Sequence, residues 1–351
     1  MNYELWLILL DISNYQKIKL INKYKNEENV YNNFEDILKN NKVISEKLKN
    51  FKKEDLKEQV TNLYNKLIKH KIGYITYSNP LYKEKLQGVL QSPYFLFYKG
   101  NIDVINNKSI GVVGARKCSN YGFAVTKLLT KELITNNITL ISGGARGVDS
   151  YAHKTTLEDG GYNICVLGCG MDIIYPSENK SLFYDIEENG VLISEFLPGT
   201  KPLRENFPKR NRIISGLSDG VIVVEASEKS GSLITAKLAQ KQDKKVIVVP
   251  GSILYKGASG SNKLIRDGGS ICTDIQDLQT LLSLEHCNIR PMYFKPEKEE
   301  ILELITDSPV HIDDIFKSSS VDRGALYALL FEMQIKNEII CLPGNYYVRT
   351  I

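Results

Sequence analysis

The sequence predicts an α/β fold in which a doubly wound parallel sheet lies between a helical amino-terminal segment and a winged-helix tail. Between residues 104 and 282, short β-branched segments of almost continuous apolar character alternate with helical ones, as expected of strands buried on both faces of a parallel sheet. Several of these segments end in a glycine-rich turn. The tail from about residue 290 has another pattern, with three helical stretches and a two-strand hairpin.

The composition is that of an ordinary globular protein. Hydrophobic residues make up 42% of the 351-residue chain and charged residues 25%, both near the usual averages. The net charge of +4 is too small to predict nucleic-acid binding by itself, although clustered cations would change that. No apolar run reaches the ~18 residues that a membrane span requires, and Trp6–Leu10 lacks the flanks of a leader peptide. A cytoplasmic protein without a membrane partner is expected.

The six cysteines and four histidines do not form a metal-binding pattern. No two cysteines have CxxC spacing, so reduced thiols are expected. The histidines at 70, 153, 286 and 311 are scattered along the chain, and no zinc site is predicted from them. The sequence therefore gives no reason to expect a metal or a cofactor.

The two ends of the chain form separate regions. The amino-terminal region, residues 1–75, is rich in lysine, has apolar residues near helical spacing and is interpreted as a small helical domain. Helices are expected there at Ile18–Tyr24, Asn33–Asn40 and Glu54–Lys69. The carboxy-terminal region, residues 290–351, begins with a linker flanked by Pro291 and Pro296. Its hairpin turns at Pro343-Gly344-Asn345.

The central region, residues 76–285, carries the alternation of strands and helices. The expected strands are Ser109–Val113, Thr139–Ser142, Asn163–Leu167, Val191–Ser194, Val221–Glu225 and Val246–Val249, with a further strand at Tyr94–Tyr98. The expected helices are Phe123–Thr135, Ser150–Glu158, Glu178–Glu188 and Ser232–Lys241. Right-handed crossovers place the carboxyl ends of these strands at one edge of the sheet, where doubly wound folds bind their ligands.

The first glycine-rich turn, from Gly111 through Gly114 to Arg116, joins a strand to a helix. Such a turn presents backbone N–H groups to an anion at a helix start. The spacing differs from the dinucleotide-binding GxGxxG, and no GK[ST] of a Walker loop follows. We expect Gly114 to allow close approach and Arg116 to bind a phosphate in bidentate fashion; an ion pair across the sheet edge is the alternative for Arg116.

The second turn has three glycines in five residues. Successive N–H groups in such a turn form a nest for an anion. The expected phosphate-binding residues of this nest are Ser142, Gly143, Gly144, Arg146 and Gly147. Asp149 is expected to cap the helix that follows, and His153 to be packed rather than to act as a base.

Further polar residues lie at the starts of later helices. Lys180 in the third helix, the hydroxyls of Ser232 and Thr235, and Lys263 are candidate phosphate contacts. The basic run Lys209, Arg210, Asn211 and Arg212 follows Phe207, a combination that suits a nucleic-acid backbone with base stacking; a solvated basic helix start is the alternative. Tyr175 and Phe207 are the candidate stacking residues.

A catalytic constellation is missing from these turns. No Ser/His/Asp set, carboxylate pair or metal cluster converges on them in the sequence, and the nearby acids Asp149, Glu195 and Glu225 have no evident partner. The crevice is interpreted as one that holds phosphate without breaking bonds.

The motifs together resemble a known family. VVGARKCSNYG, ISGGARGVDSYAH, VLGCGMDIIYPSENK, NFPKRNRIISGLS, SGSLITA and SGSNKLIRDGG are similar to segments of the DNA-processing protein A family, called DprA or Smf. The resemblance covers residues 80 to 280 almost continuously, and the NFPKRNRIISGLS block is its most specific part.

The resemblance implies an extended Rossmann-like domain that binds single-stranded DNA without catalysis. It also implies a homodimer that protects incoming single strands and loads RecA recombinase onto them during natural transformation. Carried onto this sequence, it makes Arg116, the Ser142–Gly147 nest, Lys180 and the Ser232/Thr235 helix start phosphate contacts. The Lys209–Arg212 run is a further candidate, with bracing of the sheet by Asn211 and Arg212 as the alternative.

The family resemblance also bears on the two ends. Its amino-terminal piece is usually a small helical domain similar to a sterile-alpha-motif fold, and many members have a winged helix at the other end. Winged helices often enter a major groove, but the third helix of this tail has few basic residues, with Arg323 near its start and Lys336 at its end.

Two other functions stay open at this stage. The first is a nucleotide phosphoribohydrolase of the related lysine-decarboxylase-like group, whose glutamate follows a Gly-Thr turn. Here the matching stretch, Gly231 to Lys237, contains no acid, which leaves Glu225 as the candidate. The second is a nucleotide-sensing domain, which would bind a small nucleotide in preference to an oligonucleotide.

Overall fold

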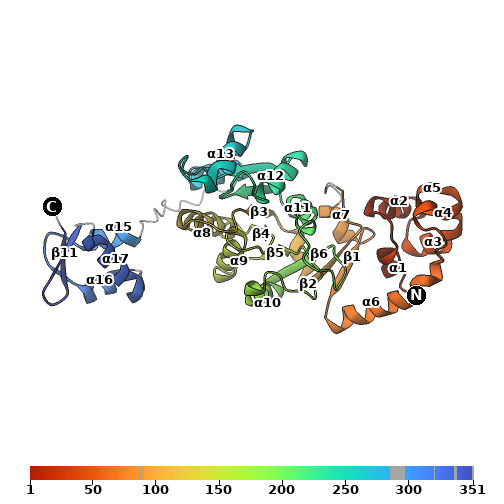
Figure 1. Cartoon of the computed structure of the whole chain (residues 1–351), viewed down its shortest axis with the longest axis horizontal. Coiled ribbons are helices and arrows are strands. Elements are labelled where there is room, and N and C mark those ends of the chain that lie inside the picture. Colours follow the sequence, from red (N-terminus) through yellow and green to blue (C-terminus); the bar gives the residue numbers. More distant parts are fainter. Residues whose placement is uncertain (87–88, 90, 285–296, 320, 336–337, 350–351) are drawn as a thin grey trace. The chain divides into compact units, whose positions relative to one another are not determined.

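The structure is a computed structural model that describes residues 1–86, 89, 91–284, 297–319, 321–335 and 338–349. The chain divides into two compact units, Met1–Glu285 and His286–Ile351 (Figure 1). The linker prolines Pro291 and Pro296, and the predicted domain limits at 285 and 290, lie outside the described residues. The predicted boundaries themselves stay predictions.

A mixed, mostly parallel sheet forms the centre of the first unit, with nine strands among the described residues. Their spatial order is β1 (Gly73–Thr76), β2 (Phe95–Gly100), β6 (Gly190–Ser194), β5 (Asn163–Val166), β4 (Thr139–Ser142), β3 (Ser109–Val113), β7 (Gly220–Val223), β8 (Lys245–Val248) and β9 (Ser270–Ile271). The pairs from β6 to β9 are parallel. The β1–β2 and β2–β6 pairs are antiparallel, a feature that the sequence analysis did not foresee.

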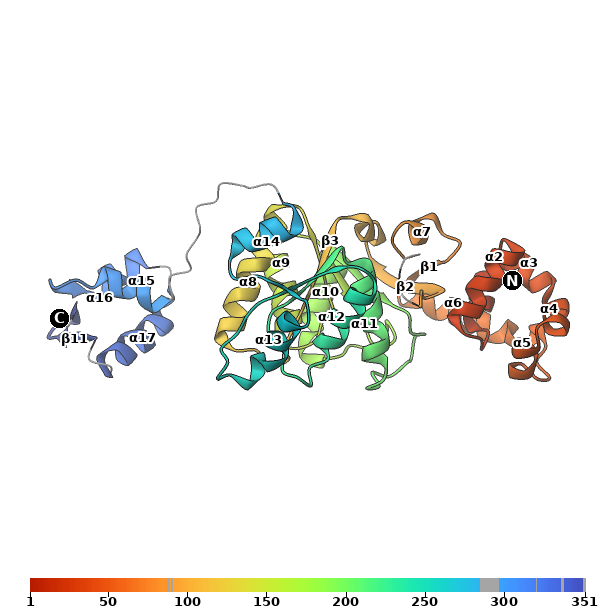
Figure 2. The ribbon, with the colours of Figure 1, turned by 90° about the horizontal axis from the view of Figure 1, so that it is seen from above.

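Helices cover both faces of this sheet (Figure 2), so its central strands are buried throughout. The helices of this part are α7 (Pro80–Leu86), α8 (Asn120–Thr135), α9 (Val148–Glu158), α10 (Lys180–Asn189), α11 (Asn206–Leu217), α12 (Ser232–Lys241), α13 (Ser259–Arg266) and α14 (Ile275–Leu282). Residues of α8, α9 and α14 pack on Ile110 and Val112, whereas α7, α11, α12 and α13 share a cluster with Val113. The two faces of β3 thus alternate as a strand requires. The predicted α/β fold is confirmed.

The amino-terminal helices belong to the same compact unit as the sheet. They are α1 (Tyr3–Leu9), α2 (Asn14–Tyr24), α3 (Glu27–Asn32), α4 (Phe34–Asn40), α5 (Lys42–Lys47) and α6 (Lys57–Lys69). One hydrophobic cluster joins Trp6 and Leu67 of this region to Phe97 of β2 and Phe183 of α10. Helix α1 was not predicted because Leu5–Leu9 is a continuous apolar run and lacks the amphipathic pattern of a surface helix.

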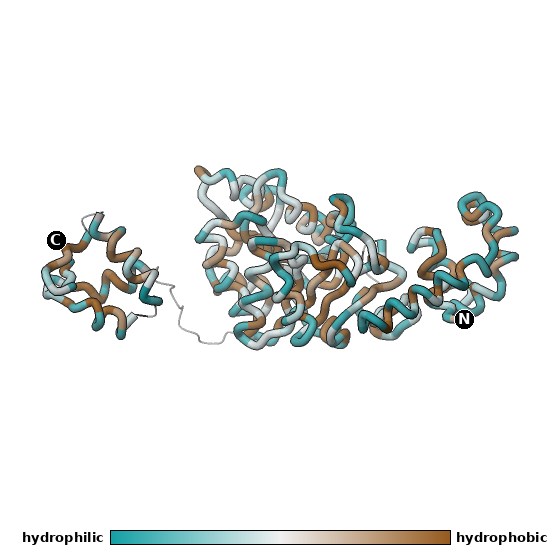
Figure 3. The backbone as a smooth tube through the Cα atoms, turned by 60° about the horizontal axis from the view of Figure 1, so that its bottom comes forward, coloured by the Kyte–Doolittle hydropathy of each residue, from teal (hydrophilic) through white to brown (hydrophobic). Residues whose placement is uncertain are grey.

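In the described part of this unit, four 3₁₀ segments connect these elements: η1 (Lys53–Leu56), η2 (Ile102–Asn106), η3 (Ser177–Asn179) and η4 (Lys256–Ala258). The hydropathy colouring in Figure 3 shows the apolar strands in the interior and polar segments outside. No helix among the described residues has the length and apolar character needed to cross a bilayer.

The second unit is a winged helix, as predicted. It contains α15 (Glu297–Leu304), β10 (Val310–His311), α16 (Ile312–Ser318), α17 (Arg323–Ile335), β11 (Ile339–Leu342) and β12 (Tyr346–Arg349). The strands pair in the order β10-β12-β11. The hairpin turns through Gly344 and Asn345, whose φ angles of +85° and +61° are ones that glycine and asparagine tolerate.

Candidate phosphate-binding cavity

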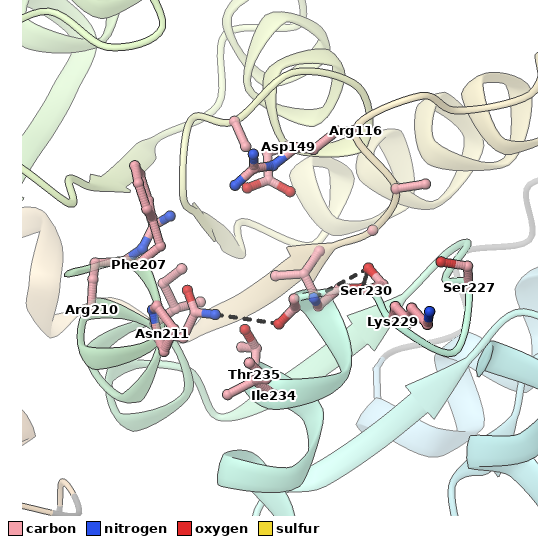
Figure 4. Close-up of a pocket in the computed structure, with 18 of the residues that line it drawn as sticks. Arg116, Asp149, Phe207, Arg210, Asn211, Ser227, Lys229, Ser230, Ile234 and Thr235 are labelled. Carbon is pink, nitrogen blue, oxygen red and sulfur yellow. Dashed lines mark hydrogen bonds between the residues drawn. The ribbon is translucent and has the colours of Figure 1, made fainter. Parts of the chain in front are cut away.

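A cavity of about 550 Å³ lies at the carboxyl ends of β3 and β7 (Figure 4). Three segments enclose most of it: the turn after β3, the loop and first residues of α11, and the turn that leads into α12. The lining residues that matter here are Gly114, Arg116, Lys117, Asp149, Tyr175, Pro202, Arg204, Phe207, Arg210, Asn211, Ser227, Lys229, Ser230, Ser232 and Thr235. This is the edge at which a doubly wound sheet is expected to bind its ligand.

Four cations of the lining are available to a ligand. The side chains are those of Arg116, Lys117, Arg204 and Lys229, all exposed. None of them forms an ion pair with another described residue, so the ion pair considered as an alternative for Arg116 is not found there. Asp149 is the single acidic side chain of the lining, and a surplus of positive charge in a concave site attracts anions.

Two aromatic rings lie at the same cavity. The rings of Tyr175 and Phe207 are 5.6 Å apart between centroids and inclined by 44°. The guanidinium carbon of Arg116 lies 5.7 Å from the Phe207 centroid. A Cβ on Gly168 would come within 2.8 Å of the Phe207 ring, so the glycine lets this ring pack closely. The pair offers a face on which a planar base can stack.

The glycine nest after β4 is occupied from within the chain. The Gly143 N–H donates to Asp149 Oδ2 at 3.2 Å, and the Gly144 carbonyl accepts from Asn179 Nδ2 at 3.0 Å. The φ angles of Gly144 and Gly147 are +62° and +75°, which a side chain would strain. Burial raises the pKa of Asp149, while the Arg210 charge and the backbone N–H groups oppose that rise.

The helix-capping role predicted for Asp149 is wrong. Helix α9 has Gly147 as its N-cap residue, without a side-chain cap, and the Asp149 carboxylate turns back to Gly143 instead. His153 is packed, as expected, because its Nδ1 lies 2.7 Å from Asn163 Oδ1 inside the protein and burial lowers its pKa to about 4.

Ser142 and Arg210 of the basic run are buried and have structural partners. Ser142 Oγ donates to the Val112 carbonyl at 2.6 Å. The buried Arg210 donates from Nη1 to the Gly143 carbonyl at 2.7 Å and to the Val166 carbonyl. These predicted phosphate contacts need correction, because the groups concerned already satisfy main-chain partners.

Arg212 also does not line the cavity, because its side chain is paired elsewhere. It forms a buried ion pair with Glu195, which corrects the predicted phosphate contact and agrees with the bracing alternative. Asn211 lines the cavity, where its Nδ2 donates to the Gly231 carbonyl at 3.4 Å and so holds the turn before α12. The reason for both is the register of α11, whose inner face is buried.

The structure does not bring the remaining predicted cations to the cavity. Lys180, Lys209 and Lys263 are exposed but lie outside its lining. Arg146 forms an ion pair with Glu178 beside a smaller hollow of about 40 Å³ that Gly143, Gly144 and Tyr175 also line. These cations were predicted to share one phosphate-binding site with Arg116, and the structure does not place them in one cavity with it.

The two predicted hydroxyls do lie together. Ser232 and Thr235 both line the cavity, and Ser232 Oγ is 2.6 Å from Ser230 Oγ.

Three cations of the lining were not predicted from the sequence: Lys117, Arg204 and Lys229. Each lies in a segment already singled out for its neighbours, Lys117 directly after Arg116 and Arg204 just before the NFPKR block, so nearness to a strand end or helix start was the available signal. Among the described residues, no cluster of three or more His, Cys, Asp or Glu side chains could hold a metal ion.

Fold and site together define an α/β protein with a cavity lined by exposed cations, and the chain also has a winged-helix unit. Residues 73–283 match the family model described as DNA recombination-mediator protein A, and residues 295–345 match the DprA winged helix domain. The chain belongs to the DNA recombination-mediator protein A family, which confirms the resemblance seen in its motifs.

Individual relatives support this assignment. The chain is 41% identical over 197 residues to the DNA processing protein DprA of Streptococcus pneumoniae, a match that covers 56% of this chain and 70% of that protein. It is 34% identical over 277 residues to Protein Smf of Escherichia coli, covering 76% and 74% of the two chains.

Solved structures of similar proteins have the same fold. The X-ray structure of DNA processing protein A from Streptococcus pneumoniae superposes with a TM-score of 0.68 at 33% identity and covers 81% of this chain and 98% of that one. DNA processing protein A from Helicobacter pylori, a structure described for its single-stranded DNA binding mode, gives a TM-score of 0.55 at 30% identity, covering 61% and 96%.

Proposed function

We propose that this protein is a single-stranded DNA-binding recombination mediator. In this proposal it works in the cytoplasm as a homodimer, protects incoming single strands and loads RecA recombinase onto them during natural transformation, without catalysing a reaction itself. The observation that supports DNA binding is the cavity whose exposed cations Arg116, Lys117, Arg204 and Lys229 lie beside the Tyr175–Phe207 ring pair.

The shape of the cavity favours single strands over duplex. A volume of about 550 Å³ has room for a nucleotide unit and not for a double helix. Stacking on Tyr175 or Phe207 requires a base face that a duplex keeps inside its own stack, whereas a single strand exposes it. The cations supply the attraction for phosphates, which does not depend on base sequence.

The positions of the nearby acids support a non-catalytic role. Asp149 is buried and accepts from the Gly143 N–H, and Glu195 is paired with Arg212. Glu225, the residue on which the phosphoribohydrolase alternative depends, is buried, accepts from Ser119 Oγ at 2.7 Å and is not part of the cavity lining. Each carboxylate thus has a structural partner.

The homodimer and the loading of RecA recombinase are proposed on the ground of family membership. A dimer would carry two cavities, and one strand bound in both would gain affinity through effective concentration. Helix α17 of the winged-helix unit has few cations, and we therefore assign single-strand binding to the cavity.

The test is fluorescence anisotropy with labelled single-stranded and duplex oligonucleotides, titrated with salt. We expect a preference for the single strand, and a log–log salt slope that becomes shallower by roughly 0.7 in Arg116→Ala, since one phosphate contact is lost. Lys263→Ala is the matched control, because Lys263 is an exposed cation of the same unit outside the cavity. Equal affinity for duplex, or the same slope change in both variants, would contradict the proposal.

Two further measurements separate the alternatives. Displacement of the oligonucleotide by a nucleoside monophosphate at similar phosphate concentration would favour a nucleotide-sensing domain. Release of free base from that monophosphate, lost in Glu225→Gln, would favour the phosphoribohydrolase. Neither result is expected.

A further inference from the structure

The loop between β6 and α11 brings a cation to the cavity from outside the sheet turns. Pro202 and Arg204 of this loop line the cavity. Its far end is tied to α11, because Asn206 Nδ2 donates to the Lys201 carbonyl at 3.2 Å. The Asn206 N–H donates to the Leu203 carbonyl at 3.0 Å. The backbone around Arg204 is therefore fixed on the side of the helix.

The near end of the loop is held by the segment that follows β5. The Gly170 N–H donates to the Thr200 carbonyl at 2.9 Å, and the Gly199 N–H donates to Asp172 Oδ1 at 2.7 Å. A Cβ on Gly170 would come within 2.7 Å of the Leu197 carbonyl oxygen, so the two segments are in close contact. The Asp172 carboxylate is therefore one of the groups that hold this end of the loop.

The other oxygen of that carboxylate binds the amino-terminal helices. Lys66, in the last turn of α6, places its Nζ 2.8 Å from Asp172 Oδ2. The side chain of Asp172 is only 12% exposed and that of Lys66 37%, so solvent screens this pair less than a fully exposed one. Although burial alone raises the pKa of Asp172, the hydrogen bonds from Lys66 and the Gly199 N–H outweigh it and hold the pKa below its ordinary value.

Apolar packing joins the same elements. Leu197 of the loop packs against the hydrophobic cluster that contains Leu63 and Leu67 of α6 and Met171 beside Asp172. Within this contact, the Asp172 carboxylate connects a helix to the backbone of the loop through two separate oxygens. A single ionised side chain thus carries both hydrogen bonds.

We propose that Lys66 is a positioning residue for the cavity: through Asp172 it fixes the loop that holds Arg204 in place for DNA. This inference rests on the proposed function. Lys66 is not part of the cavity lining, whereas Arg204 is exposed and has no ion pair among the described residues. The position of Arg204 therefore depends on the backbone that carries it, and ordering that backbone before DNA arrives lowers the entropy cost of binding. The amino-terminal helices contribute to DNA affinity without touching the strand.

A double-mutant cycle in the full chain tests this mechanism. Lys66→Met keeps the aliphatic stem and removes the charge; we expect it to weaken binding of a single-stranded oligonucleotide by about threefold to tenfold, the scale of coupling between residues that share a network. In an Arg204→Ala background the same change should have no further effect, because the loop acts through Arg204. Lys66→Arg should restore wild-type affinity. Lys69→Met, which removes an exposed cation from the same turn of α6, is the matched control.

Hydrogen exchange supplies a second readout that needs no DNA. The backbone N–H groups of residues 197–204, except the prolines at 198 and 202, should exchange faster in Lys66→Met than in wild type or Lys69→Met. Asp172→Asn, which keeps an oxygen for the Gly199 N–H but loses the charge, repeats the measurement if Lys66→Met folds poorly. Unchanged exchange, unchanged affinity, or a Lys66 effect that adds fully to Arg204→Ala would overturn the proposal. If wild type does not bind single strands but the exchange result holds, the proposed function fails and the positioning role of Lys66 survives.

Discussion

The turn after β4 and the turns after β3 and β7 lie at one edge of the sheet and use their polar groups in opposite ways. In the β4 turn, the Gly143 N–H and carbonyl are bonded to Asp149 and Arg210. After β3 and β7, by contrast, Arg116 and Lys229 are exposed and have no ion pair within the described part of the chain. The β4 turn is scaffold, whereas the turns after β3 and β7 leave their cations exposed at the cavity.

The scaffold turn supports the ligand-facing turn directly. The Val148 N–H donates to the Ala115 carbonyl at 3.2 Å, and a Cβ on Gly147 would lie 2.2 Å from that same oxygen. The backbone next to Arg116 is thus packed against the nest. A cation that must meet a phosphate gains from such a rigid base, since less freedom is lost on binding.

The largest effect is expected where the scaffold loses its buried cation. Arg210→Met removes the hydrogen bonds to two carbonyls and leaves the buried Asp149 without a facing positive charge. Since a hydrogen bond to a charged group contributes about 1.5–3 kcal/mol, we expect the loss of both to cost about 3–5 kcal/mol. Urea unfolding measures this loss, with Arg116→Ala as the exposed-cation control, which should stay within about 0.5 kcal/mol of wild type. Equal stability of both variants would contradict the structural role that distinguishes the β4 turn from the turn after β3.

Lys17 extends the comparison to a buried cation that has a carbonyl partner. Its Nζ donates to the Ile8 carbonyl, and burial lowers its pKa to about 7, although the nearby Asp11 opposes that shift. Since the unfolded pKa is higher, unfolding takes up a proton between about pH 7 and pH 10, and stability rises with pH in that window. Below pH 7 the cost of the buried lysine is largest.

Replacement of Lys17 should therefore change stability in a pH-dependent way. The gain in unfolding free energy of Lys17→Met over wild type should be larger at pH 6 than at pH 9, by about 2.7 kcal/mol from the proton linkage. Lys19→Met, an exposed neighbour on α2, should give the same difference at both pH values. A Lys17 difference independent of pH would mean that the lysine keeps its charge in the fold.

The aromatic pair is expected to have the next largest effect, and on binding rather than on the scaffold. Phe207→Ala should weaken single-strand binding by about 1–3 kcal/mol if a base stacks on the ring. Tyr184→Ala is the control, because Tyr184 is half exposed on α10 and does not line the cavity. Anisotropy with a short oligonucleotide measures both. An effect of Phe207→Ala that matches its change in unfolding free energy would indicate packing on Gly168 instead of stacking.

The sequence predicts the fold better than it predicts which charged side chains are buried and which are exposed at the cavity. The strand ends could be predicted because buried β-branched runs stop at glycine, and Arg116 lies three residues after Val113, the last residue of β3. The sequence left open whether Arg212 braces the sheet and did not predict the burial of Arg210. Both depend on which face of α11 packs on the sheet and on the partners Gly143, Val166 and Glu195. Arg204 was missed because its loop reaches the cavity only through tertiary contacts with Gly170 and Asp172.

The smallest expected effect separates exposed cations that belong to the cavity from those that do not. Lys229→Ala should weaken single-strand binding a few-fold and make the log–log salt slope shallower by roughly 0.7, the value for one phosphate contact on a single strand. Lys209→Ala removes an equally exposed cation from the basic run, outside the lining, and should leave the slope unchanged. If the salt slope becomes shallower by the same amount in both variants, the strand also contacts the outer face of α11. The distinction between cavity cations and other exposed cations would then not hold for α11.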